Sequence, residues 1–304
     1  MPFKFIDLFA GIGGFRLALE SAGGECVFSS ETDPNAVKTY AANFGDVPAG
    51  DIRSIDASAV PDFDVLAAGF PCQAFSVIGK REGFANETSG TLFFEIERIL
   101  KARRPSAFIL ENVKHLVGHA KGETFRTILR HLEALGYAVQ WRVLNALDFG
   151  LPQKRERTII VGFRDGQAFE WPELVPRENA LSLKDILEED VPERYWASRK
   201  IREARQASMK EKEYPKPFIS HCRISGDCHP HPYSAALRWD SSYNTLLVNN
   251  ERRLTEREML RLQGFPDSYV PAVPYTRMKA LCGNSVPVPM IRAVALKMAE
   301  ALNA

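Results

Sequence analysis

The chain has 304 residues, of which 45% are hydrophobic and 25% charged, a composition typical of a globular protein with a sizeable buried core. Its net charge of +1 excludes a globally basic nucleic-acid-binding protein, so any surface for a polyanion must be local. No apolar stretch is long enough to cross a bilayer, and no signal peptide precedes the first apolar run. The five cysteines show no paired framework spacing, which predicts free thiols and a cytoplasmic protein without a membrane anchor.

Short apolar runs alternate with helical patterns in the first half of the chain, which is the order expected of βαβ units and a parallel sheet. Strands are expected at residues 3–9, 25–29, 64–68, 107–110, 138–144 and 158–163. Helices are expected at residues 15–21, 91–101 and 124–135. The first half therefore predicts an α/β domain with a Rossmann-like sheet.

The character of the chain changes after about residue 164, where the runs become short and Pro, His and Trp become frequent. Order returns with the capping box Thr255-Glu-Arg-Glu258, which opens a helix that should end near Gly264. Pro287 is a suitable first-turn residue for a last helix, which extends to about Leu302.

That last helix is apolar enough to pack on the sheet of the first half. We therefore expect a discontinuous large domain made of residues 1–163 plus 252–304, with residues 164–251 inserted as a smaller domain.

A glycine-rich turn follows the first expected strand, in Asp7-Leu-Phe-Ala-Gly-Ile-Gly-Gly14. A strand, a glycine turn and a helix N-terminus form a favourable site for a nucleotide. Glu31 ends the second strand, where an acid can accept the ribose hydroxyls, and Asp51 could accept from an adenine amino group. The turn lacks the full dinucleotide fingerprint, so a tight structural turn, a surface acid and a loop residue are the alternatives.

Cys72 lies immediately beyond an apolar strand, in Gly69-Phe-Pro-Cys-Gln-Ala-Phe-Ser76. Ligands of open α/β sheets bind beyond the carboxyl ends of the strands, so this thiol should face a site. An inert apolar cysteine is the alternative. The next strand ends in Glu111-Asn-Val113 and brings a carboxyl group to the same crevice. A thiol, a carboxyl group and a nucleotide-like cofactor together indicate covalent catalysis.

Further motifs follow in order along the chain. They are Gln153-Lys-Arg-Glu-Arg157, the helix segment Arg253-Leu-Thr-Glu-Arg-Glu-Met-Leu-Arg-Leu-Gln-Gly-Phe-Pro-Asp267, and Gly283-Asn-Ser-Val286. With the glycine turn, the cysteine motif and Glu111-Asn-Val113, they make the chain resemble the bacterial DNA (cytosine-5) methyltransferases of restriction–modification systems over nearly its whole length. The resemblance implies a methyltransferase that takes its methyl group from S-adenosylmethionine (AdoMet), without a metal.

The resemblance also implies catalytic roles. Cys72 would attack C6 of a flipped cytosine, Glu111 would hold and protonate N3, and Arg157 would contact O2, with Arg155 beside them in the catalytic set. The reactive carbons are buried in a stacked duplex, so the base must leave the helix.

For the cofactor, the resemblance implies that Phe9 stacks on the adenine, Glu31 binds the ribose and Asp51 holds the adenine amino group. The rest of the implied cofactor pocket consists of Ala10, Gly11, Gly13, Ile52, Pro71, Leu92, Asn284 and Ser285.

The inserted segment 164–251 is expected to be the target-recognition domain. Between Arg194 and Arg223 stand nine Lys or Arg residues and three Glu, which indicates either a phosphate-contacting stretch or a solvated helix face over 201–213. Arg223 and Arg238 are the candidate base or phosphate contacts of this domain, and Lys80 and Arg81 are those of a lid at 73–88. The His221-Cys222 and Cys228-His229-Pro-His231 cluster lacks common zinc spacing, so we expect no metal.

The expected partners are double-stranded DNA and a restriction endonuclease acting on the same site, with the enzyme itself a monomer. Three alternatives remain. A tRNA cytosine-5 methyltransferase has similar motifs, whereas a non-catalytic DNA-binding relative would not need Cys72 and Glu111. An NAD-dependent oxidoreductase would need neither the thiol nor the basic insert.

Overall fold

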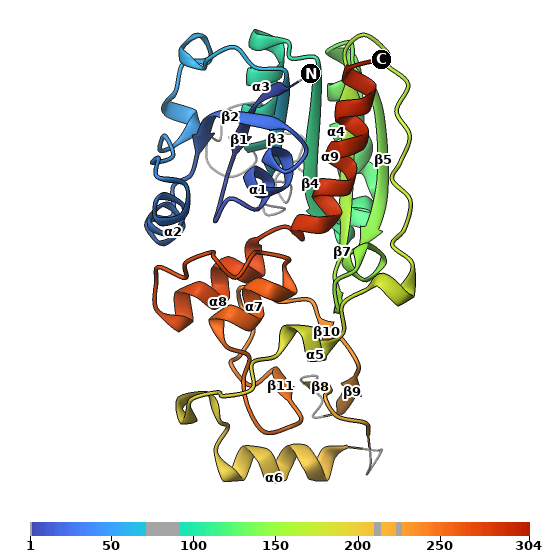
Figure 1. The fold of residues 1–304 in the computed structure, drawn as a ribbon. Helices are drawn as coiled ribbons and strands as arrows, with labels where there is room; N and C mark the ends of the chain where they lie inside the picture. Colours follow the sequence, from blue (N-terminus) through green and yellow to red (C-terminus); the bar gives the residue numbers. More distant parts are fainter. Residues whose placement is uncertain (1, 71–91, 210–213, 223–226) are drawn as a thin grey trace. The chain divides into compact units, whose positions relative to one another are not determined.

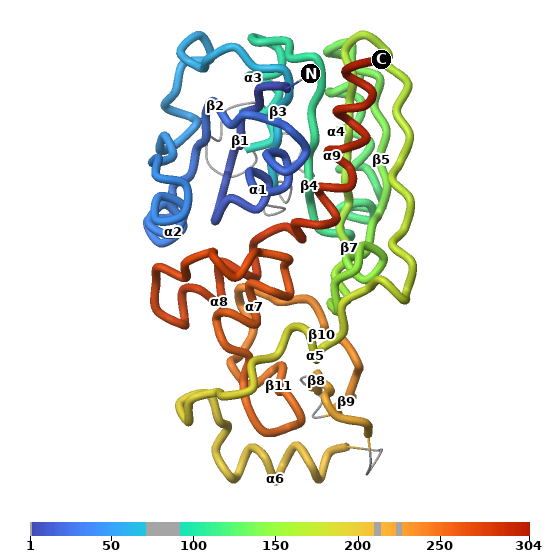
Figure 2. Tube along the Cα trace, viewed as in Figure 1, coloured from blue at the N-terminus to red at the C-terminus, as the bar shows by residue number. Residues whose placement is uncertain are grey.

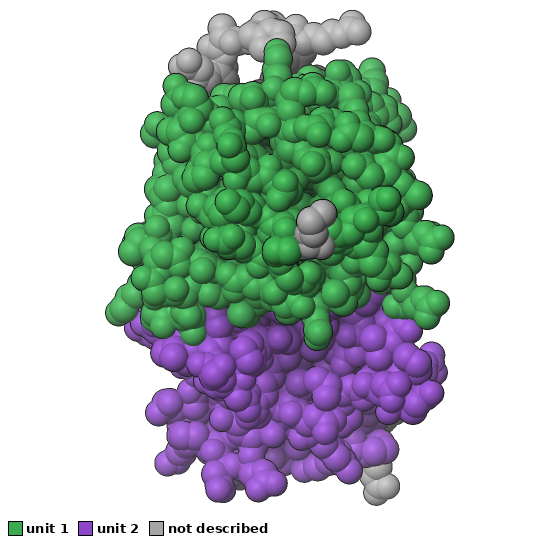
Figure 3. All heavy atoms as spheres, turned by 45° about the horizontal axis from the view of Figure 1, so that its top comes forward, with its two compact units in different colours: residues 1–144, 156–173, 290–304 green, residues 145–155, 174–289 purple. Residues whose placement is uncertain are grey.

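The computed structural model describes residues 2–70, 92–209, 214–222 and 227–304 (Figure 1). They fall into two compact units, which Figure 3 colours separately. Unit 1 comprises Met1–Leu144, Glu156–Glu173 and Met290–Ala304, and unit 2 comprises Asn145–Arg155 and Leu174–Pro289. Within the described residues, no helix has the length and apolar character needed to cross a membrane.

Unit 1 is built on a six-stranded sheet in the order β2-β1-β3-β4-β7-β5. Its strands are β1 (Phe3–Leu8), β2 (Gly24–Ser30), β3 (Val65–Gly69), β4 (Ala107–Val113), β5 (Ala138–Asn145) and β7 (Glu156–Phe163). β1 pairs in parallel with β2 and β3, and β3 pairs in parallel with β4. β7 is antiparallel to β4, so the sheet is mixed, whereas alternation of strands and helices predicted an all-parallel one. The difference arises because β5 and β7 are joined by a short connection with one 3₁₀ helix (Ala146–Phe149) and the two-residue β6, whereas a parallel crossover usually contains an α-helix.

Helices cover both faces of this sheet. They are α1 (Gly14–Glu20), α2 (Pro34–Phe44), α3 (Leu92–Arg103), α4 (Glu123–Ala134) and α9 (Val288–Leu302). Apolar residues of β1, β3 and β4 pack against α3 and α4 in one cluster, while α1 and α9 lie on the side of the sheet nearer the viewer in Figure 1. The chain trace in Figure 2 shows α9 returning to the unit in which the chain begins, as its apolar pattern predicted.

The expected helices of the first half appear within a few residues of their predicted bounds, but α2 was not predicted. Its start is nonetheless marked in the sequence. Asp33 accepts a hydrogen bond from the backbone N–H of Asn35, and Pro34 occupies the first helical position. An aspartate cap followed by proline is a favourable helix start.

Unit 2 contains short strands and short helices. Its strands are β6 (Gln153–Lys154), β8 (Ile219–Cys222), β9 (Cys228–His231), β10 (Ser234–Ala235) and β11 (Leu246–Val248). Its helices are α5 (Leu183–Ile186), α6 (Arg199–Ser208), α7 (Glu256–Leu262) and α8 (Tyr275–Asn284). β8 is the central strand of a sheet with the order β11-β8-β9.

The two units differ from the expected domain boundaries. Residues 252–289, which we expected in the large domain, group with the recognition segment in unit 2. One reason is a buried ion pair at the start of α7, where Arg252 donates to Glu258 at 2.8 and 2.9 Å. Glu258 also accepts from the backbone N–H of Glu188 at 2.9 Å, which ties α7 to the middle segment.

A disulfide joins Cys222 to Cys228, so the expectation of free thiols is wrong for this pair. The two residues face each other in the antiparallel register of β8 and β9, with their Cα atoms 4.1 Å apart. Directly opposed positions of an antiparallel pair bring Cβ atoms close together, which a disulfide requires. The six-residue separation in sequence does not reveal this register. Among the described residues, Cys26 and Cys282 are free.

The capping box predicted at Thr255 is confirmed. Its hydroxyl accepts from the backbone N–H of Glu258 at 3.1 Å, and the Glu258 carboxylate accepts from the N–H of Thr255 at 2.8 Å. The same hydroxyl donates to Glu188. This one side chain therefore starts α7 and links it to the preceding segment.

We expect Thr255→Ala to lower the free energy of unfolding by about 1 kcal/mol, because the first turn of α7 loses an acceptor for its free N–H group. Urea unfolding followed by circular dichroism measures the change. Thr255→Ser retains the hydroxyl and is the control. Equal stability of the alanine and serine variants would show that the box contributes nothing measurable.

Candidate active site

The glycine-rich turn after β1 has the unusual backbone that its sequence indicates. Phe9, Gly11 and Gly13 all have positive φ, at 58°, 55° and 77°. A Cβ at Gly13 would lie 2.2 Å from the ring of Phe44, so only glycine fits there. At Gly11 a Cβ would meet nothing closer than 4.0 Å. The turn is therefore tightly packed at Gly13 and open at Gly11, as a cradle for a ligand would be.

Glu31 fixes this turn against the end of β2. One carboxylate oxygen accepts from the backbone N–H of Gly11 at 2.8 Å, and the other accepts from Thr32 and Asp33 at 2.6 and 2.8 Å. A carboxylate offers about four acceptor positions, so capacity for a hydroxyl donor remains. Glu31 is thus held in place by the backbone beside the glycine turn.

The carboxylate of Asp51, expected to accept from an adenine amino group, already has partners within the chain. It caps the short 3₁₀ helix Ile52–Ser54 and forms an ion pair with Arg53 at 2.5 Å. The hydrogen bonds from Arg53 lower the pKa of Asp51. An adenine amino group would have to share this carboxylate with the guanidinium. The side chain of Ile52 is buried in the core, so its contribution to a cofactor would come from its backbone.

Glu111 lies at the carboxyl end of β4 and forms a buried ion pair with Arg157 of β7. The Nε–Oε1 distance is 2.7 Å, and the side chains are 9% and 12% exposed. Burial lowers the pKa of Arg157, while the Glu111 carboxylate acts in the opposite direction. Two charged groups taken out of water together are stabilised only with well-formed hydrogen bonds, so the pair holds both side chains in a defined orientation.

Asn112 connects Glu111 to the exit of β3. Its side-chain amide donates to the carbonyl of Phe70 at 2.8 Å, and its Oδ1 accepts from the N–H of Val113. Gly69 and Glu111 are register partners. The segment that leads to Cys72 therefore starts directly beside Glu111, whereas Cys72 itself and Pro71 lie outside the described residues.

Asp7, in the motif but not among the predicted site residues, is wholly buried beside the glycine turn. Neither carboxylate oxygen has a hydrogen-bond partner among the described residues. Burial, and secondarily the charge of Glu31, raises its pKa well above the ordinary value, against a smaller opposing effect of Arg16. An unpartnered buried carboxyl costs free energy, so this residue lowers the stability of the fold next to the glycine turn.

Arg155, expected in the catalytic set, is 1% exposed. Its guanidinium donates to the main-chain carbonyls of Leu237, Gly283 and Ser285 at 2.9, 2.9 and 2.6 Å. These contacts are those of a residue that positions backbone rather than one that reaches a substrate. These contacts do not support a direct catalytic role for Arg155.

The remaining predicted cofactor residues lie in both units. Leu92 is the first residue of α3 and is half-buried, and Ala10 is buried in the glycine turn. Asn284 is exposed as the last residue of α8, and Ser285, 9% exposed, follows it.

Three of the four predicted DNA contacts, Lys80, Arg81 and Arg223, lie outside the described residues. Arg238 is described. Its side chain is 68% exposed and forms an ion pair with Asp240 at 3.0 Å. It is therefore available at the surface of unit 2.

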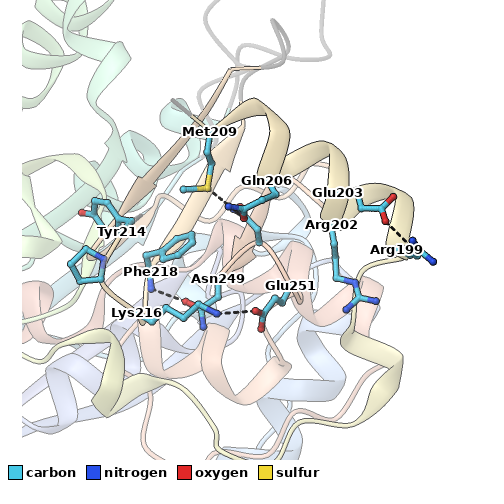
Figure 4. Close-up of a pocket in the computed structure, with 12 residues that line it drawn as sticks. Arg199, Arg202, Glu203, Gln206, Met209, Tyr214, Lys216, Phe218, Asn249 and Glu251 are labelled. Atoms are coloured by element: carbon cyan, nitrogen blue, oxygen red, sulfur yellow. Dashed lines mark hydrogen bonds and ion pairs between the residues drawn. The ribbon is translucent and has the colours of Figure 1, made fainter. Parts of the chain in front are cut away.

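A cavity of about 1080 Å³ lies beside α6 in unit 2 (Figure 4). Its glutamates are neutralised, since Arg199 pairs with Glu203 at 2.7 Å and Lys216 pairs with Glu251 at 2.9 Å. Its other lining residues are Arg202, Gln206, Met209, Tyr214, Pro215, Phe218, Asn249 and Asn250. None of the predicted cofactor or catalytic residues lines it. Of the helix expected over 201–213, the described part is α6, which ends at Ser208, and residues 210–213 lie outside the described residues.

The comparisons with known proteins decide the family. C-5 cytosine-specific DNA methylases match residues 3–300. The chain belongs to this family. The Type II methyltransferase M.HaeII of Haemophilus aegyptius is 53% identical over 303 residues, covering 99% of this chain and 94% of that protein. M.NgoBI of Neisseria gonorrhoeae, also a Type II methyltransferase, is 53% identical over 96% of this chain and 91% of its own.

The fold of this methylase agrees with the family. The S. pombe Dnmt2 methyltransferase superposes with a TM-score of 0.75 over 99% of this chain and 100% of that chain, at 21% identity. The predictions of an AdoMet-methyltransferase type of α/β fold and of a DNA cytosine-5 methyltransferase are thereby confirmed. Among the described residues, no group of three or more His, Cys, Asp or Glu is arranged to hold a metal ion.

Sequence reasoning on this methylase missed the residues that support the site. Asn112 and Gln153 stand inside recognised motifs, and Gln153 is fully buried with its amide donating to the carbonyl of Leu262 at 2.7 Å. Their place in the motifs was the available signal, but which carbonyl each would bind depends on the fold. Arg53, two residues beyond Asp51, carried no signal at all.

We expect the stability of the wild-type methylase, relative to Asp7→Asn, to fall as pH rises. Below about 3.8, the ordinary pKa, Asp7 is protonated in both the folded and the unfolded chain. Above it the unfolded chain ionises while the buried carboxyl resists, so stability is lost until the pH passes the raised folded pKa. Urea unfolding of both proteins between pH 4 and 9 gives the difference. A difference that does not change with pH would contradict the burial argument.

Proposed function

We propose that this methylase transfers a methyl group from AdoMet to C5 of a cytosine that is flipped out of duplex DNA at a specific site. The observation that carries the proposal is the buried pair of Glu111 and Arg157, fixed where β4 ends beside the strand that leads to Cys72. An acid and a guanidinium side by side match the N3 and O2 edge of a cytosine.

Methyl transfer to C5 requires a thiolate, an acid and a cation. Carbon 5 of cytosine is a poor nucleophile, and addition of the Cys72 thiolate to C6 makes it enamine-like. Glu111 supplies a proton to N3, which prevents negative charge from building on the ring, and Arg157 binds O2. C5 then takes the methyl group, its proton leaves to a base, and Cys72 is eliminated with the C5–C6 double bond restored, while the N3 proton returns to Glu111.

The glycine-turn residues fit AdoMet, which when bound supplies an electrophilic methyl group. Glu31 retains acceptor capacity for the ribose hydroxyls, the turn is open at Gly11, and Phe9 directly follows the last residue of β1. Asp51 fits with the condition that Arg53 shares its carboxylate. The predicted roles of Pro71, Leu92, Asn284 and Ser285 complete this proposal.

The substrate is proposed to be double-stranded DNA, because relatives at 53% identity are named Type II methyltransferases. We further propose a cytoplasmic monomer that modifies the site cut by a partner endonuclease. An RNA substrate is not favoured, because the relatives at 53% identity are named Type II methyltransferases. Sequence recognition is assigned to the segment 164–251, in which Arg223 is a candidate for a base or phosphate contact.

We expect Cys72→Ser to abolish methyl transfer while AdoMet binding persists, since the thiol acts on the base and not on the cofactor. Duplex DNA carrying 5-fluorocytosine should trap wild-type protein covalently, because fluorine cannot leave C5 as a proton does. Denaturing gel electrophoresis with labelled DNA detects the adduct, and Cys72→Ser is the control. Active wild-type protein that forms no adduct would overturn the mechanism.

We expect Glu31→Ala to weaken AdoMet binding by about 1–3 kcal/mol, the typical loss when hydrogen bonds to a charged group are removed. Isothermal titration calorimetry measures the affinity. Because Glu31 also holds the glycine turn, Glu31→Gln is the matched variant, with one acceptor oxygen retained. Unchanged affinity in both variants would remove Glu31 from the ribose role.

A further inference from the structure

The loop 237–244, between β10 and β11 of unit 2, presents an exposed tryptophan. Trp239 is 58% exposed, whereas Leu237, two residues earlier, is 4% exposed. An indole in water forgoes a large burial free energy, and tryptophan is enriched where proteins bind partners. A single exposed aromatic residue is common on protein surfaces. What distinguishes Trp239 is how firmly the backbone of its loop is held.

That backbone is held at its start by two buried side chains. The guanidinium of Arg155 donates to the carbonyl of Leu237 at 2.9 Å, and Gln153 accepts from the N–H of Leu237 at 3.1 Å. Arg155 also binds the carbonyls of Gly283 and Ser285. The start of the loop is therefore joined to the end of α8.

Gly283 packs directly against the backbone of Arg238 and Trp239. A Cβ at this position would lie 2.4 Å from the backbone nitrogen of Trp239 and 2.6 Å from the carbonyl carbon of Arg238. Main chain thus rests on main chain, with no space for a side chain between them. Such close contact allows little movement of Arg238 and Trp239 relative to α8.

Lys279 of α8 holds the far side of the loop. Its ammonium group donates to the carbonyl of Ser241 and lies 3.5 Å from that of Arg238. The ammonium group also lies 5.7 Å from the centre of the Tyr243 ring. The loop is therefore fastened at both ends while its tip remains at the surface.

The exposed tip carries a cation next to the indole. Arg238 is bound through Nε and Nη2 to the carboxylate of Asp240 at 3.2 and 3.0 Å. This pairing orients a guanidinium that is 68% exposed. An oriented arginine beside a fixed aromatic ring offers a donor for guanine or phosphate and an apolar surface for bases.

We propose that Trp239 contacts the bases of bound duplex DNA, with Arg238 beside it, and that Arg155, Gln153, Gly283 and Lys279 hold this contact in place. The inference rests on the proposed function. DNA is the occupant because the loop and the lysine that holds it carry two cations, Arg238 and Lys279, against the one carboxylate of Asp240, and because a groove of DNA presents thymine methyl groups to an apolar side chain. A rigid loop loses little conformational entropy on binding, so its contacts contribute fully to affinity.

The test is Trp239→Ala in the full chain, with Trp239→Phe as the conservative variant. Trp141→Ala is the matched control, because Trp141 is also exposed, at 40%, but lies on β5 in unit 1. The duplex probe is plasmid DNA for methyl transfer, with sites mapped by bisulfite conversion. Fragments of the same plasmid serve for binding by fluorescence anisotropy.

We expect Trp239→Ala to raise the KM for DNA and weaken duplex binding roughly ten-fold, within the range of losing one good base contact. Trp239→Phe should recover part of the loss, and AdoMet affinity should be unchanged in both. Trp141→Ala should behave as wild type. A purely structural role would instead lower AdoMet affinity or the melting temperature together with DNA binding.

Equal DNA binding by Trp239→Ala and Trp141→Ala would overturn the inference, as would a change confined to self-association in size-exclusion chromatography. Wild-type protein that binds duplex but methylates no cytosine would overturn the proposed function instead. The binding comparison of the two variants still decides whether Trp239 contacts DNA, so the two failures are distinguishable.

Discussion

The parallel pairing of β3 with β4 is the constraint on which the chemistry of unit 1 depends. It puts Gly69 opposite Glu111, so the chain that leaves one strand towards Cys72 starts beside the carboxylate that ends the next. Asn112 strengthens this arrangement by binding the Phe70 carbonyl. Because the ends of parallel strands meet at one edge of a sheet, the exit of β3 and the end of β4 lie together although they are far apart in sequence.

The antiparallel strand β7 supplies the guanidinium that pairs with Glu111. It runs back along β4 and brings Arg157 opposite Val113, close enough to pair with Glu111 at 2.7 Å. A guanidinium from a strand of opposite direction therefore reaches the carboxylate from the neighbouring strand. The mixed sheet is thus directly linked to the geometry of the acid and its partner.

In unit 2, buried polar side chains hold loops and helix ends in place. Arg155 binds three carbonyls of segments far apart in sequence, and Arg252 with Glu258 ties α7 to the chain before it. Short strands bury little apolar surface, so buried hydrogen bonds of this kind help to fix the positions of the loops in unit 2. The disulfide between Cys222 and Cys228 adds a covalent link across β8 and β9.

The sequence by itself determined the family, the α/β order, the capping box at Thr255 and the residues that form the chemical motifs, because these depend on local patterns and on spacing along the chain. Only the tertiary structure decided that Arg155 binds backbone while Arg157 pairs with Glu111. Both arginines stand in one short motif and alternate along one stretch of chain. Their roles separate because Arg155 stands in the break between β6 and β7 and belongs to unit 2, whereas Arg157 lies in β7 of unit 1. The neighbours of each are supplied by parts of the chain that no local pattern connects.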